Sequence, residues 1–139
     1  MVLVRRLLLL AYAVAVFFVT TWPLNPHSAN YPADLPWWAN LHYTPGYVDL
    51  RSFAANIVMF VPFGVLVPLL WPAADSWRRM LVRALLTSAT IEVVQLVLDL
   101  TIGGKRTVDV NDLISNGIGA LLGLALLRLA LPAIPARAG

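Results

Sequence analysis

Polar residues that could do chemistry gather in the C-terminal half of this chain, between long apolar runs. Asp109 and Asp112 follow the basic pair Lys105 and Arg106, and Asn116 lies further on in a glycine-rich stretch. Carboxylates beside a guanidinium could bind an anionic group or accept a proton from a substrate. Residues spaced i, i+3, i+7, i+10 and i+14 share one helix face, and this is the spacing of Asp109, Asp112, Asn116, Gly119 and Gly123.

A second polar pattern recurs along residues 80–100, which are otherwise aliphatic. Ser88, Glu92, Gln95 and Asp99 stand at i, i+4, i+7 and i+11, so they form one stripe on a helix. Glu92 falls near the middle of this apolar stretch, where a charged side chain costs about 2.5 kcal/mol or more and almost always faces other helices. Glu92 either pairs with Arg106 or an amide to hold helices together, or lines a functional polar pocket.

We expect Glu92 to face Asn56 and residues 112–116 in a pocket between helices. The small-xxx-small spacing of Gly119 and Gly123 predicts close helix packing, and the expected partner is the helix that carries Glu92. Asp109 has an equally good explanation as a helix N-cap. We expect no metal and no cofactor, and the predicted pocket residues are Asn56, Glu92, Gln95, Arg106, Asp109, Asp112 and Asn116.

Composition indicates which elements must position these residues. Of the 139 residues, 60% are hydrophobic and only 12% are charged, and the mean hydropathy is +0.77. Soluble domains contain about a quarter charged residues, so this is an integral membrane protein. We predict one all-α domain over residues 1–139, a bundle of four transmembrane helices at about 5–22, 52–71, 79–100 and 112–131. The absence of cysteine excludes disulfides and thiolate metal sites.

The first apolar segment and the loop after it each allow two interpretations. A basic pair followed by an apolar run is typical of a cleaved signal peptide, but no small-residue cleavage site follows, so we predict an uncleaved helix. The proline- and aromatic-rich residues 23–51 exclude a long helix. This loop is either an interfacial anchor or a lid over a site, and tryptophan and tyrosine favour the anchor.

The arginines predict how the bundle is oriented. Placing both termini in the cytoplasm puts seven basic residues inside, namely Arg5, Arg6, Arg78, Arg79, Arg83, Arg128 and Arg137. Arg51, Lys105 and Arg106 then lie outside, which agrees with the positive-inside rule. The net charge of +3 therefore reflects membrane orientation, and no basic, aromatic stripe suggests nucleic acid. We expect the polar pocket to open toward the envelope.

Three blocks of sequence resemble the VanZ-like family of small bacterial membrane proteins. They are NIVMFVPFG at residues 56–64, IEVVQL at residues 91–96, and the pattern R-x-x-D-x-N-D-x-x-x-N-x-x-G that begins at Arg106. The resemblance covers about residues 51–127. It implies four spans in a bacterial cell membrane and a link to envelope chemistry, because the family is named for a protein that lowers susceptibility to teicoplanin.

Two classes of function fit these residues. In the first, the pocket binds an envelope lipid or wall precursor, with Arg106 contacting an anionic headgroup. In the second, an intramembrane enzyme uses Glu92 or Asp112 as a general base, with Asp109 and Asp112 able to hold a divalent metal. The sequence lacks a serine nucleophile motif, a histidine dyad and a phosphate-binding loop, so we favour binding. A structural accessory to a larger complex is a third class.

Overall fold

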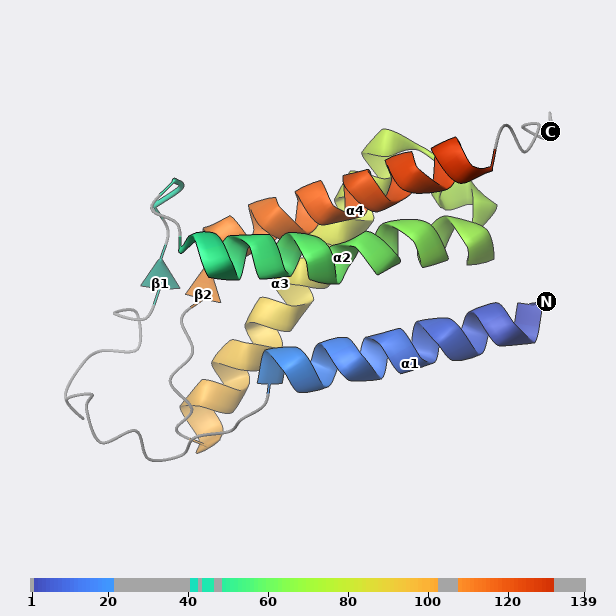
Figure 1. Cartoon of the computed structure of the whole chain (residues 1–139). Coiled ribbons are helices and arrows are strands. Elements are labelled where there is room, and N and C mark those ends of the chain that lie inside the picture. Colours follow the sequence, from blue (N-terminus) through green and yellow to red (C-terminus); the bar gives the residue numbers. More distant parts are fainter. Residues whose placement is uncertain (1, 22–40, 43, 47–48, 103–107, 132–139) are drawn as a thin grey trace.

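The computed structural model describes residues 2–21, 41–42, 44–46, 49–102 and 108–131. Within these residues, four helices are long and apolar enough to cross a membrane: α1 (Val2–Thr21), α2 (Leu50–Leu70), α3 (Trp77–Ile102) and α4 (Val110–Ala130). The start of α1 and the end of α4 lie at one end of the bundle (Figure 1). The predicted all-α membrane bundle of four helices is confirmed.

Aspartate N-caps determine where α2 and α4 begin. The Asp49 side chain accepts a hydrogen bond from the Arg51 backbone N–H at 3.1 Å. Asp109 does the same at α4, accepting from the Asn111 N–H at 2.8 Å. Both helices therefore begin two residues before the predicted starts at 52 and 112. The 3-10 turn η2 (Pro72–Ala74) follows α2 and leads into α3.

A short strand pair at the other end of the bundle was not predicted. β1 (Leu41–His42) and β2 (Val108–Asp109) are parallel, with Leu41 opposite Val108 and His42 opposite Asp109. β2 leads directly into α4, so this pair joins the loop between α1 and α2 to the start of α4. The rest of the proline- and aromatic-rich loop lies outside the described residues.

The closest helix contact joins α4 to α2, and glycines make it possible. A Cβ atom at Gly119 would collide with the backbone carbonyl of Ile57, and one at Gly123 with that of Val61. Gly64 does the same from α2, since a Cβ there would lie 2.8 Å from the Leu124 nitrogen. The sequence predicted close packing against the helix that carries Glu92. That partner was wrong for the glycines, because α2 has its own small residue at the crossing.

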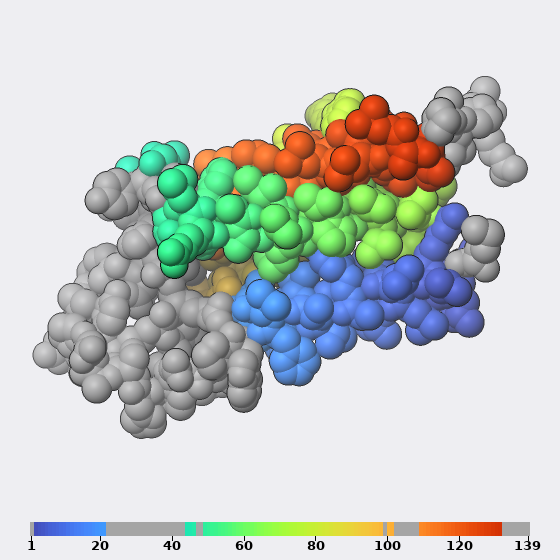
Figure 2. Space-filling view, in the orientation of Figure 1, coloured from blue at the N-terminus to red at the C-terminus, as the bar shows by residue number. Residues whose placement is uncertain are grey.

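The buried apolar core lies among α2, η2, α3 and α4, and its members are Phe60, Val67, Ala74, Met80, Ala84, Ala120 and Leu124. α4 packs on one side of α2 and α1 on the other, as the space-filling view shows (Figure 2). α1 is the most loosely held span, with only Val16, Thr20 and Thr21 buried. Most of its surface therefore faces the bilayer.

Candidate polar binding site

Three helices bring polar side chains together inside the bundle. Asn56 comes from the second turn of α2, Glu92 from α3 and Asp112 from the first turn of α4. The Asp112 carboxyl group lies close enough to both the Glu92 carboxyl and the Asn56 amide to interact with them, and Glu92 also lies beside the Asp109 backbone. Glu92 is only 5% exposed. We call Asn56, Glu92, Asp112 and Asn116 the polar cluster.

Three buried atoms of the polar cluster have no hydrogen-bond partner in the part of the chain that the structure describes. They are Asn56 Nδ2, Glu92 Oε2 and Asn116 Oδ1. The Asn56 amide faces Asp112, but its Nδ2 atom does not meet hydrogen-bond distance and angle, so this is a polar contact only. An unpaired buried polar atom costs about 1–3 kcal/mol. The cluster thus presents one donor and two acceptors that a bound polar group could satisfy.

Asn116 also ties α4 to α3 through its other amide atom. Its Nδ2 donates a hydrogen bond to Ser88 Oγ at 2.8 Å, and both side chains are buried, with exposed fractions of 3% and 0%. This bond fixes the orientation of the amide group through Nδ2. The other amide atom, Oδ1, is buried and has no partner among the described residues. Ser88 belonged to the predicted polar stripe but not to the predicted pocket, and the structure adds it as the residue that positions Asn116.

Asn111 joins the first turn of α4 to the loop above it, a role that the sequence analysis missed. Its Nδ2 donates to Asp109 Oδ1 at 2.8 Å, and its Oδ1 accepts from the Gly46 backbone N–H at 3.0 Å. Gly46 has a φ of 93°, in the region that favours glycine. Asn111 is 2% exposed. The available signal was its place between two aspartates at a helix start, where a polar side chain can bond a nearby turn.

The other predicted pocket residues are placed differently. Gln95 bonds outside the cluster: its Nε2 donates to the carbonyl oxygen of Thr20 at 2.8 Å and so ties α3 to the last turn of α1. Asp109 caps α4 and also bonds Asn111. Gly119 and Gly123, which were predicted for helix packing and not for the pocket, face α2. Arg106 lies outside the described residues.

A comparison of the sequence with protein family models identifies the family of this chain. The family model described as VanZ/LLP1 matches residues 7–131, which span most of α1 and all of α2, α3 and α4. The chain belongs to the VanZ/LLP1 family. The match confirms the resemblance found in the sequence, and it includes every member of the polar cluster. Comparisons with curated proteins and with solved structures find no match.

The described part of this VanZ/LLP1 chain holds no group of three or more His, Cys, Asp or Glu side chains arranged for a metal ion. Glu92 and Asp112 are two carboxylates with amide neighbours, a set suited to hydrogen bonding. A cavity of about 730 Å³ lies elsewhere, between α1 and the pair α2 and α3, and no side chain of the polar cluster lines it. The cluster and the cavity are therefore separate features of the VanZ/LLP1 bundle.

Proposed function

We propose that this VanZ/LLP1 membrane protein binds an envelope lipid or a wall-related molecule at the polar cluster. The observation that carries the proposal is the set of three unpaired buried atoms, each contributed by a different helix. A bundle that kept such atoms for packing alone would lose stability at each one. A ligand group that bonds all three would recover that loss and would draw the helices together.

The donor set indicates the chemistry of the ligand. Two carboxyl groups and two amides suit hydroxyl or amino groups, such as those of a lipid-linked sugar or a wall precursor, because carboxylates accept bonds and amides do both. Arg106, three residues before Asp109, is proposed to contact an anionic headgroup. We place the protein in the plasma membrane of a bacterium, with both termini in the cytoplasm, because of the arginine distribution. The cluster then lies toward the envelope side.

The test measures membrane abundance and ligand binding together. Purified wild type, Glu92→Gln and Asp112→Asn are each incubated with lipids extracted from bacterial envelopes, and the retained lipids are identified by mass spectrometry. Each substitution keeps the side-chain shape and replaces one carboxyl oxygen by an amide NH2 group, which donates a hydrogen bond instead of accepting one. Because an unpaired buried polar group costs about 1–3 kcal/mol, we expect retention to fall about ten-fold at normal abundance.

Asp49→Asn is the matched control for these two variants. It makes the same chemical change at the same end of the bundle, and asparagine caps a helix about as well as aspartate. Its binding should equal that of the wild type. Unchanged retention in Glu92→Gln and Asp112→Asn would leave the cluster as helix packing and would reject the proposed function.

A link to glycopeptide susceptibility is the cellular counterpart of this proposal. We propose that expression in a teicoplanin-susceptible bacterium lowers its susceptibility, and that Glu92→Gln abolishes the change without lowering abundance. The inhibitory concentration of teicoplanin is the readout. An equal effect from wild type and Glu92→Gln would separate the phenotype from the polar cluster.

The facing carboxyl groups of Glu92 and Asp112 favour one second candidate, an intramembrane enzyme. Paired carboxyl groups can act as general acid and base on a lipid-linked or anionic substrate, with Asp109 and Arg106 nearby in sequence. This candidate predicts a chemically altered lipid after incubation with wild type. It further predicts that Glu92→Gln retains the unaltered lipid instead of releasing a product, whereas the binding proposal predicts no product from any variant.

A further inference from the structure

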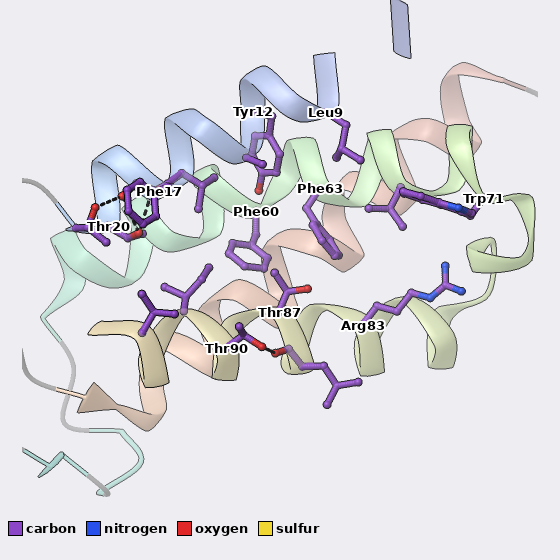
Figure 3. A pocket seen from close by; sticks show the side chains of 17 residues that line it. Leu9, Tyr12, Phe17, Thr20, Phe60, Phe63, Trp71, Arg83, Thr87 and Thr90 are labelled. Atoms are coloured by element: carbon purple, nitrogen blue, oxygen red, sulfur yellow. Dashed lines mark hydrogen bonds between the residues drawn. The ribbon is translucent and has the colours of Figure 1, made fainter. Parts of the chain in front are cut away.

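A groove runs along the inner side of α1 and is a second feature suited to a ligand. The cavity of about 730 Å³ is lined by α1, α2 and α3, and its walls are mostly apolar (Figure 3). Its volume lies within the range of about 300–1,000 Å³ that is usual for small-molecule sites. We call it the α1 groove.

The α1 groove exists because α1 is held by a few polar contacts rather than by continuous packing. Arg5 Nη1 donates to the Leu69 carbonyl at 3.0 Å, near the start of α1. In its middle, Tyr12 Oη donates to the Met59 carbonyl at 2.9 Å. Gln95 holds its last turn. These three contacts keep α1 beside α2 and α3 while leaving space between their side chains, and that space lies within the membrane-spanning segments.

Among the described residues that line the α1 groove, one is charged. Arg83 is the seventh residue of α3, about 9 Å along the helix from its start, and its long side chain can extend toward the membrane surface at that end. Its guanidinium lies at the same end of the groove as Trp71 (Figure 3). No described carboxylate pairs with it, whereas Arg128 on α4 bonds Asp75 at 2.7 Å. The groove is thus apolar along its length and cationic at one end.

We propose that the α1 groove binds an anionic phospholipid, with one acyl chain between the helices and the phosphate at Arg83. The bilayer surrounds these helices, so it supplies the apolar occupant. From Leu9 to Thr21 the lining spans about 18 Å of α1, a length comparable with that of one acyl chain, since two layers of chains make up a hydrocarbon core of about 30 Å. Charge complementarity selects an anionic headgroup over a zwitterionic one. This inference does not rest on the proposed function, because no polar-cluster side chain lines the groove.

The first experiment counts lipids retained by the purified full-length chain. The protein is delipidated in detergent, exposed to equal amounts of phosphatidylglycerol and phosphatidylcholine, and weighed intact by native mass spectrometry. Wild type should retain one lipid with a preference for phosphatidylglycerol. Arg83→Gln should lower that preference about five-fold, the equivalent of about 1 kcal/mol. Arg79→Gln, an exposed arginine of the same helix outside the lining, should keep it.

A large side chain introduced into the α1 groove tests whether an acyl chain occupies it. Ala13→Phe places a ring in the α1 groove and should abolish retention of both lipids, while Ala15→Phe lies on the same helix outside the lining and should not. Equal loss from Arg79→Gln and Arg83→Gln would show a general surface-charge effect and overturn the proposal. Retention unaffected by Ala13→Phe would do the same.

Quenching of tryptophan fluorescence by lipid tests the proposal even if the variants substituted in the α1 groove do not fold. One chain keeps only Trp71, which lines the α1 groove, and a second keeps only Trp77, which does not, with the remaining tryptophans changed to phenylalanine. The two rings are similarly exposed, at 52% and 48%. In phosphatidylcholine vesicles with a few per cent brominated phosphatidylglycerol, Trp71 should be quenched more than Trp77. Equal quenching would mean random contact with lipid and would reject the site.

Discussion

A single methyl group at Gly123 should separate the two helices that form most of the core. Alanine there would bring a Cβ against the Val61 carbonyl and 2.9 Å from the Gly64 Cα, both backbone atoms that cannot rotate away. Gly117, on another face of the same helix, is the matched control. An alanine at Gly117 would meet only the ends of two flexible side chains, Leu81 at 3.2 Å and Leu85 at 3.7 Å.

The two variants share the change in helix propensity and differ in the cost of overpacking. Replacing a mid-helix glycine by alanine stabilises a helix by about 0.5–1 kcal/mol at either position. Overpacking costs about 1–3 kcal/mol where the neighbours cannot yield, which applies at Gly123 and not at Gly117. We therefore expect Gly117→Ala to be neutral or slightly stabilising. Gly123→Ala should be less stable than Gly117→Ala by about 1–3 kcal/mol, because the helix-propensity gain cancels in the comparison.

Unfolding in mixed micelles of dodecyl maltoside and SDS, followed by circular dichroism, measures this difference. Wild type, Gly117→Ala and Gly123→Ala are unfolded at equal protein concentration, and their free energies of unfolding are compared. Equal values for the two variants would refute the reasoning, since they would mean that the α2 and α4 backbones can move apart at no cost. Gly64→Ala should behave like Gly123→Ala, because its Cβ would strike the α4 backbone at the same crossing.

Three further predictions use single side chains. The Ser88→Ala and Asn116→Ala double-mutant cycle should give a coupling of about 0.6–1.7 kcal/mol in the same unfolding assay, and zero coupling would mean that their hydrogen bond adds nothing. Asp109→Ala should cost about 1 kcal/mol and Asp109→Asn much less, whereas equal losses would reject capping as its structural role. The chain lacks cysteine, so a single introduced thiol can be labelled alone. In the predicted orientation Thr44 lies outside the cell and Ala73 in the cytoplasm, so Thr44→Cys should react with an impermeant maleimide in intact cells and Ala73→Cys should not. The reverse pattern would mean that the orientation is inverted.

The spans were predictable because hydrophobic length alone determines them. The predicted segments 79–100 and 112–131 lie within two residues of the boundaries of Trp77–Ile102 and Val110–Ala130. The error at the start of α4 has one cause: Asp112 was taken as its first residue, whereas Asp109 acts as its cap. The parallel pair β1 and β2 could not be predicted, since two residues per strand carry no alternation for a pattern to reveal.

Packing partners were less predictable than spans, because helix periodicity gives a face but not its neighbour. The face of Asp112, Asn116 and Gly119 was assigned to one partner helix, yet it meets two. Asn116 bonds Ser88 of α3, whereas Gly119 meets α2. Gly64 carries the missing information, because it puts a small residue of α2 against the α4 backbone. The α1 groove could not be predicted from the sequence either, because it depends on the distance between α1 and its neighbouring helices.

The glycine crossing and the polar cluster are physically connected. On α4 the cluster residue Asp112 lies about two turns before Gly119, and on α2 the cluster residue Asn56 lies about two turns before Gly64. Below the cluster the α2 and α4 backbones are in contact, so no ligand can pass between these two helices there. We therefore expect a ligand to approach from the end at which α4 begins, where Asn111 holds the turn around Gly46. A ligand headgroup entering there would meet Asp112 and Glu92 together, because their carboxyl groups face each other, so Asp112→Asn and Glu92→Gln should lower lipid retention to similar extents. A loss of retention in only one of the two variants would contradict this shared contact.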